Sequence, residues 1–304
     1  MITPESFAME ASLDISSVSA LITGTQDGQL ARYFAISGLA LTLWDYLLTL
    51  EDEAEVVWQR PHLAPKRLVY RLTRFGLTVG LVYFNTVLLF LPKSSMNPVV
   101  CKSFAAIIIC FIVVSAVGTN TYLVIRHLQS WEGRKVVVRT MQVSLVLTHI
   151  PALVLGILAM KQIYGYATYI PSIKTCASIA KPAWLNSAWA CVVAFDTFTV
   201  ILALLNVLDR PRHRDSDIPS YLNADGAPYF LLIFVLRWIT LTLLIKIPLA
   251  HYFTAIFILW PLTVITLSRF ILATELSRRQ ARQPPSTTSS IGTYGSTIEL
   301  NRWR

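Results

Sequence analysis

The chain of 304 residues has few charged residues and few of the side chains that catalyse reactions or bind metals. Charged residues make up 14% of it, against roughly 25% in an ordinary soluble domain, so there is too little charge to cover a water-facing surface. Its five histidines are scattered, and no cluster of His, Cys and acidic residues has the spacing of a zinc site. We therefore expect no enzymatic activity, no metal site and no cofactor.

The sequence also lacks the motif residues of two well-known families of membrane proteins. The last apolar stretch, from Tyr252 to Ala273, has no lysine that could hold retinal as a Schiff base, and it lacks an Asn-Pro-x-x-Tyr motif. The third stretch is followed by Arg126 and His127, with no Asp-Arg-Tyr motif. The chain is therefore neither a retinal protein nor an orthodox rhodopsin-class receptor.

Long apolar stretches are what the chain has in abundance. Because a helix needs about 20 residues to cross about 30 Å of hydrocarbon, seven stretches qualify as membrane spans. They predict an all-α integral membrane protein, a bundle of seven transmembrane helices in the lipid bilayer. The stretches are Leu30 to Leu50, Phe75 to Leu91, Ser103 to Ile125, Met141 to Met160, Asn186 to Leu208, Tyr229 to Ile247 and Tyr252 to Ala273.

The basic residues are distributed unevenly between alternate loops. Of 26 Lys and Arg, 18 fall on one side of the predicted bundle and seven on the other. Because cytoplasmic loops hold the excess of positive charge, we expect the N-terminus outside and the C-terminus in the cytoplasm. The net charge of +9 is thus mainly a topology signal, and we expect no nucleic-acid partner. We favour the plasma membrane over internal membranes.

Composition divides the chain into three parts. Residues 1–29 form an extracytoplasmic N-terminal tail, residues 30–273 the transmembrane domain, and residues 274–304 a cytoplasmic tail whose Pro-, Ser- and Thr-rich composition predicts disorder. The tail begins with a basic segment, Arg278 to Arg282, next to the last span. Such a segment attracts anionic lipid, which we expect as a partner there.

Two of the four cysteines lie on the predicted outer side. Cys101 is at the outer end of the third span, and Cys176 is in the long outer loop from Lys161 to Leu185. Unpaired thiols are uncommon in an oxidising compartment. We therefore predict a disulfide between Cys101 and Cys176.

One face of the first predicted helix is polar. Gly38, Thr42, Asp45, Thr49 and Glu53 recur at steps of three and four residues, so they share a helical face. This face must meet something polar, and the basic run from Lys66 to Arg74 follows in the first inner loop. A charge clamp joining the first two helices is one interpretation, and a surface that binds a partner or ligand is the other.

The same region resembles a known family. Asp45, Thr49, Glu53 and Trp58, followed by Lys66 and by Arg74 with Phe75, are similar to the N-terminal signature of a large family of fungal, mainly basidiomycete, seven-pass proteins. That family is a domain of unknown function. The resemblance implies seven spans and a fungal origin, and it implies that Asp45, Glu53 and Trp58 are the family's marked positions, without supplying an activity. Phe75 is a mild departure, because the family has Tyr there.

Asp196 and Arg237 lie near the middle of predicted spans. Asp196 is ten residues into the fifth span and Arg237 is ten residues before the end of the sixth, which places both about 15 Å deep. Because an isolated charge at the midplane costs about 3 kcal/mol or more, we expect an ion pair. The pair has either a structural role or a role in binding a proton or ligand.

Topology and the predicted cysteine pair favour a receptor-like protein that senses a signal and reports to a cytoplasmic signalling partner. The alternative is a small-solute or proton-coupled transporter built around Asp196 and Arg237.

Overall fold

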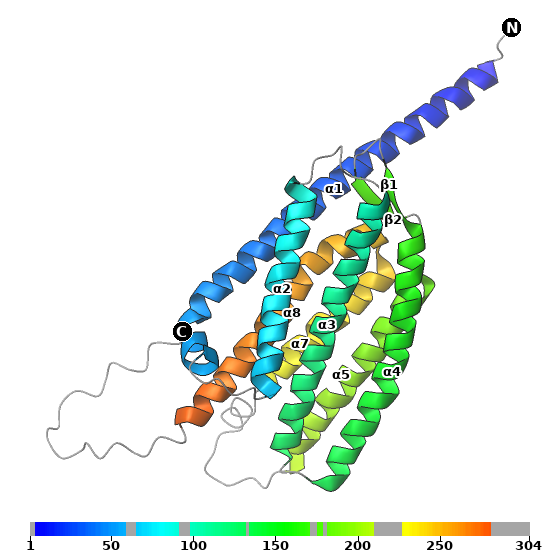
Figure 1. Cartoon of the computed structure of the whole chain (residues 1–304). Helices are drawn as coiled ribbons and strands as arrows, with labels where there is room; N and C mark the ends of the chain where they lie inside the picture. The colour runs from blue at the N-terminus through cyan, green and yellow to red at the C-terminus, as the bar shows by residue number, and fades with distance from the viewer. Residues whose placement is uncertain are drawn as a thin grey trace, which may run out of the picture.

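The computed structural model describes residues 4–58, 65–90, 98–131, 134–170, 175–178, 181–209 and 227–280. Figure 1 shows an elongated bundle of long helices in this part of the chain. The elements are α1 (Pro4–Glu53), η1 (Ala54–Trp58), α2 (Pro65–Asn85), η2 (Thr86–Phe90), α3 (Pro98–Ser130), α4 (Lys135–Tyr166), β1 (Ala167–Ile170), β2 (Thr175–Ser178), α5 (Ala183–Asp209), α7 (Ala227–Lys246) and α8 (Leu249–Gln280).

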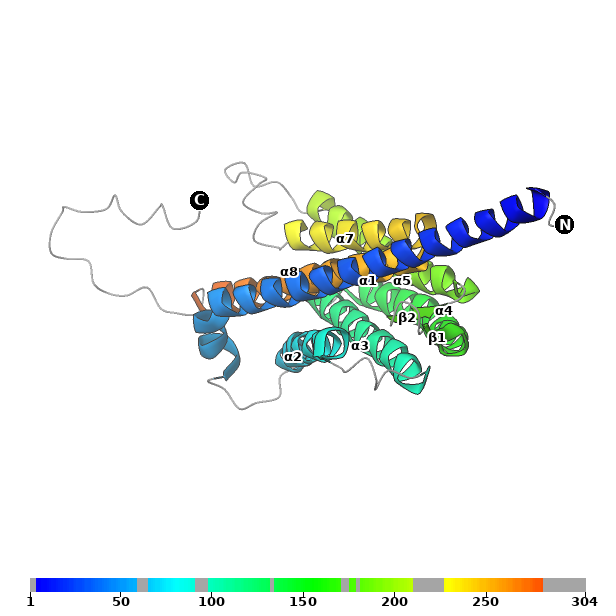
Figure 2. The ribbon, with the colours of Figure 1, turned by 90° about the horizontal axis from the view of Figure 1, so that it is seen from above.

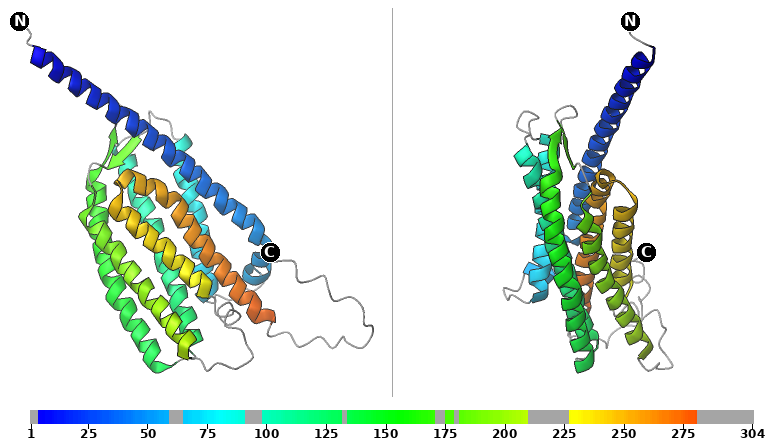
Figure 3. Two further views of the ribbon diagram at one scale, coloured as in Figure 1. Left: turned by 180° about the vertical axis from the view of Figure 1, so that it is seen from behind. Right: turned by 90° about the vertical axis from the view of Figure 1, so that its right-hand side faces the viewer.

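Seven helices in the described residues are long and apolar enough to cross a membrane, as the sequence predicts. They coincide with the predicted spans to within a few residues at most ends, although α7 ends at Lys246, one residue before the predicted end. Helix α1 begins at Pro4, so helix runs through the segment assigned to an N-terminal tail, and its first part projects beyond the bundle (Figure 3). Helix α8 continues past Ala273 to Gln280, and residues 281–304 lie outside the described part.

The all-helical prediction missed a small β-hairpin. Strands β1 and β2 pair antiparallel, with Tyr169 opposite Cys176 and Ala167 opposite Ser178. The strands are short and carry residues with high strand propensity, such as Tyr169, Ile170 and Thr175. We call the end of the bundle that carries them the hairpin end. The other end, where α1 and α8 finish, is the opposite end.

Helix α8 is the central helix. Its most apolar stretch is 67% buried within the molecule, whereas that of α4 is 6% buried. Seen from above, α1 lies along α8, with α7 on one side and α2 and α3 on the other (Figure 2). An aromatic cluster fills the core towards the hairpin end, where the Phe84 ring contacts Phe104, Phe111, Phe257 and Trp260.

Gly38 permits the close contact between α1 and α8. A Cβ atom at this position would lie 2.1 Å from the backbone oxygen of Phe257, a separation that atoms do not tolerate. Because the obstacle is backbone, it cannot rotate away as a side chain could. Gly38, the smallest residue on the polar face of α1, is thus the point where α1 and α8 come closest.

Replacing Gly38 by alanine is expected to destabilise the protein by about 2 kcal/mol, because the added methyl group pushes α1 away from α8. The matched control is Gly76→Ala, where the added Cβ would meet nothing within 4 Å. Equilibrium unfolding of the purified variants in mixed micelles containing SDS measures both changes. Equal stability of the two variants would contradict the proposed contact.

Candidate functional site

A buried cluster of charged and polar side chains joins three helices near the opposite end of the bundle. Helix α1 supplies Asp45, Thr49 and Glu53 from successive turns of one face, which the chain turns towards α2 and α8. Helix α2 supplies Tyr70 and Arg74, and helix α8 supplies Arg269. We call these six residues the polar cluster.

Arg74 is the centre of the polar cluster, and its side chain is only 1% exposed. Its Nη1 donates to Asp45 Oδ2, and its Nη2 donates to Thr49 Oγ1 at 2.8 Å. The same Nη2 lies 3.1 Å from Glu53 Oε1. The planar guanidinium presents several donors in fixed directions, so one side chain can bridge two acids and a hydroxyl.

Tyr70, Thr49 and Arg269 donate further hydrogen bonds to the carboxylates of Glu53 and Asp45. The Tyr70 hydroxyl and the Thr49 hydroxyl both donate to Glu53 Oε1, the latter at 3.2 Å. Arg269 Nε donates to Asp45 Oδ1 at 2.7 Å. Two acids therefore face two guanidinium groups, which keeps the formal charge of this buried site balanced. Such balance lowers the cost of burying these charges, because an unpaired charge in a low-dielectric interior is unfavourable.

Arg269 differs from its partners in exposure. Its side chain is 47% exposed, whereas Asp45 is 3% and Arg74 is 1% exposed. The ion pair between Arg269 of α8 and Asp45 of α1 is thus reached from the surface of the bundle. The ion pair between Arg74 of α2 and Asp45 is buried.

Sequence reasoning anticipated one half of the polar cluster. The charge clamp requires Glu53 near a basic residue of the run that ends at Arg74, and the structure brings these two together. Arg269 and Tyr70 were missed. An available signal for Arg269 was that it is the only charged residue between Tyr252 and Ala273.

The other resemblance positions lie beside the polar cluster. The π-helix η1 follows α1, and Arg71 Nη2 of α2 donates to the Val57 carbonyl oxygen there at 3.0 Å. Trp58 packs edge-on against Phe75, with ring centroids 6.2 Å apart, and lies under the Arg71 guanidinium. Lys66 is in α2, but its side chain lies outside the described part of the structure.

The two charges predicted inside the membrane lie together between α5 and α7. Arg237 Nη1 is 3.2 Å from Asp196 Oδ2, and both residues are buried. This is the distance of an ion pair, yet neither carboxylate oxygen of Asp196 accepts a hydrogen bond from the described residues. The pair is therefore less completely satisfied than the acids of the polar cluster.

A second polar contact joins α3 and α4. Asn120 Nδ2 is 2.7 Å from His149 Nε2, and the His149 ring packs edge-on against Phe195, the neighbour of Asp196. The Oδ1 atom of Asn120 is buried and has no hydrogen-bond partner among the described residues. In the part of the chain that the structure describes, no group of three or more His, Cys, Asp or Glu side chains could hold a metal ion.

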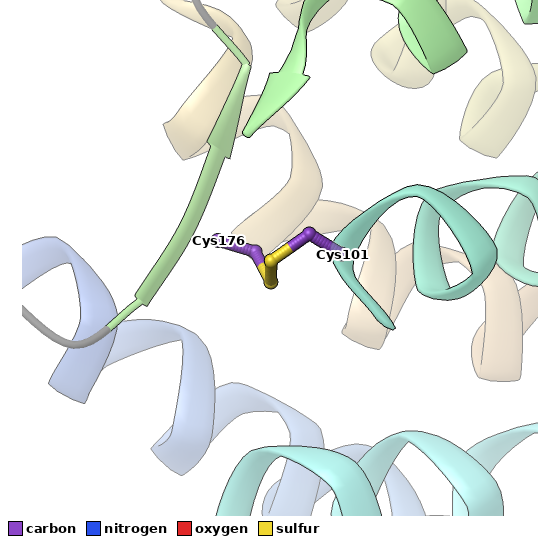
Figure 4. Close-up of a disulfide and its surroundings, with 2 residues drawn as sticks. All are labelled: Cys101 and Cys176. Carbon is purple, nitrogen blue, oxygen red and sulfur yellow. A yellow bond between two sulfur atoms is a disulfide. The ribbon is translucent and has the colours of Figure 1, made fainter. Parts of the chain in front are cut away.

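The predicted disulfide is confirmed. Cys101, at the start of α3, is bonded to Cys176 of β2, with the two Cα atoms 5.4 Å apart (Figure 4). The bond holds the hairpin against the end of α3. It closes a loop of 75 residues, which contains the whole of α4.

Removal of the disulfide by the change Cys101→Ser is expected to destabilise the protein by about 2 kcal/mol. Loop-closure entropy alone suggests about 4 kcal/mol, but helices that stay in the membrane already restrict the unfolded chain. The control is Cys191→Ser, which removes a free cysteine. Unfolding in SDS mixed micelles measures both variants. If they were equally stable, the bond would contribute no restraint.

A comparison with protein families matches the segment that contains most of the polar cluster. Residues 33–78 match the model of a family of unknown function (DUF6533). This segment contains every member of the polar cluster except Arg269. Neither the search of curated proteins nor the search of solved structures found a significant match. The similarity therefore covers the second part of α1, η1 and most of α2. It supplies no activity, and the fungal origin stays a prediction.

Proposed function

We propose that this chain is a receptor-like, seven-pass protein of the plasma membrane, with its N-terminus outside and its C-terminus in the cytoplasm. The excess of basic residues on one side supports this orientation, which places the polar cluster at the cytoplasmic end and the hairpin outside. In this proposal, a signal from outside or from within the bundle moves the cytoplasmic ends of the helices, and a cytoplasmic partner detects the movement.

The exposed ion pair between Arg269 and Asp45 carries the proposal. When Arg269 leaves Asp45, the acid keeps its contact with Arg74, so the end of α8 that carries Arg269 can move away from α1 without leaving a buried carboxylate unpaired. Breaking the buried contacts of Arg74 would be far more costly. In the polar cluster, the buried ion pairs of Arg74 thus hold α1 and α2 together permanently, whereas the ion pair between Arg269 and Asp45 can break and release α8. A releasable helix is the two-state element that signalling requires.

Proximity labelling in cells tests the proposal. A biotin ligase fused to the C-terminus is compared in the native chain, in Arg269→Gln and in the control Lys161→Gln, an exposed residue of α4 at the hairpin end. We expect Arg269→Gln to increase the labelling of a G protein or arrestin several-fold, and Lys161→Gln to change nothing. Equal labelling in all three, or a C-terminus outside the cell, would contradict the proposal.

A second candidate function is supported by Asp196. A buried carboxylate whose oxygens accept no hydrogen bond from the described residues is a candidate site for a proton or a coupled ion, as in a transporter. Proton uptake by proteoliposomes tests this alternative. A transporter would lose the uptake in Asp196→Asn, whereas a receptor-like protein would show no uptake in either form.

A further inference from the structure

Helix α4 carries a groove that neither proposed function uses. Helices α4 and α5 lie side by side at the edge of the bundle away from α1 (Figure 3). A cavity of about 700 Å³ opens along α4 between Lys135 and Thr148, with Phe198 of α5 in its wall. Its volume falls within the range of about 300 to 1,000 Å³ that is typical of small-molecule sites.

The length of the groove matches one leaflet of a bilayer. The distance along α4 from Lys135 to Thr148 is about 20 Å at a rise of about 1.5 Å per residue. Half of a bilayer, including its head groups, measures about 20 Å. The groove therefore runs from the head-group level to the midplane, as an acyl chain does. Val143, Leu147 and Phe198 line its inner part and offer an apolar surface to such a chain.

Positive charge is concentrated at the end of the groove nearest the start of α4, at the head-group level. Lys135 and Arg139 are one helical turn apart, line the groove and are exposed. Within the described residues, neither side chain forms an ion pair or hydrogen bond. Among the described residues, no acidic residue lines the groove, and the first turn of α4 has none. The side chains of Lys135 and Arg139 thus lie at the depth of the lipid phosphates, and no described acidic side chain neutralises them.

We propose that the α4 groove binds one phospholipid with an anionic head group. The head group lies against Lys135 and Arg139, and one acyl chain follows Val143, Leu147 and Phe198 towards the midplane. This site is separate from the basic segment after α8, and it does not depend on whether the protein is a receptor or a transporter. The orientation proposed above would place it in the cytoplasmic leaflet, where anionic lipids are concentrated.

Native mass spectrometry of the purified full chain tests the site. The probes are phosphatidylserine and phosphatidylcholine with identical acyl chains, and glycerophosphoserine as the free head group. We expect tighter binding of phosphatidylserine than of phosphatidylcholine. The double change Lys135→Gln and Arg139→Gln should weaken phosphatidylserine binding about 25-fold, since each basic residue contributes about fivefold. The matched control Lys161→Gln, at the other end of α4, should leave the affinity unchanged.

A second variant tests the apolar part of the groove. Leu147→Trp, in the inner half, should weaken phosphatidylserine binding because the larger side chain occupies the path of the acyl chain. An unchanged melting temperature shows that each variant is folded. Equal binding of the two lipids, equal effects of the double variant and Lys161→Gln, or full binding of glycerophosphoserine would each overturn the proposal. A dimer that covers this face in place of lipid would overturn it as well.

Discussion

Replacing Arg74 by alanine is expected to destabilise the protein by about 3 to 5 kcal/mol. The change removes the guanidinium that bridges Asp45 and Glu53, both of which are buried. Asp45 would keep Arg269, but Glu53 would keep only hydroxyl donors around a negative charge in a low-dielectric interior. Arg74→Lys should fall between the native protein and Arg74→Ala, because an ammonium group keeps the charge and cannot bridge both acids.

Arg71→Ala is the matched control, since Arg71 lies on the same helix and less than one turn away. It donates to the Val57 carbonyl and contacts Trp58, but it pairs with no buried acid in the described residues. Its loss should cost about 1 kcal/mol, the typical contribution of one hydrogen bond. Unfolding in SDS mixed micelles compares the variants. If Arg74→Ala and Arg71→Ala were equally stable, the acids would not depend on Arg74.

Asp196 and Arg237 are expected to behave as a coupled pair. Each single change to alanine leaves the other charge buried and should cost about 3 kcal/mol or more. The double change should cost less than the sum, because no charge is then left without its partner. The control Lys246→Ala removes an exposed charge from the same helix as Arg237 and should change stability by less than about 0.5 kcal/mol.

A thermodynamic cycle of the single and double variants in SDS mixed micelles measures the coupling. Additive effects would mean that the 3.2 Å separation between Arg237 and Asp196 contributes no interaction energy. A more stable double variant with apolar residues of similar size, such as Asp196→Leu with Arg237→Met, would show that the pair is kept for a reason other than stability.

The number and approximate positions of the spans could be predicted from the sequence, because hydropathy and length act locally along the chain. The disulfide was predictable for a related reason: the membrane assigns Cys101 and Cys176 to one side, which leaves few partners. The equal depth of Asp196 and Arg237 followed from the rise of a helix. These inferences need only the distance of each residue from the membrane surface.

Lateral contacts between helices could not be predicted in the same way. Depth says how far along a helix a residue lies, but it does not say which helix stands beside it. The contact of Arg269 with Asp45 joins residues 224 positions apart, and it depends on α8 lying along α1 where Gly38 permits close approach. The hairpin was missed because its two strands are too short for a clear alternating pattern. The α4 groove likewise exists only because α5 places Phe198 beside α4.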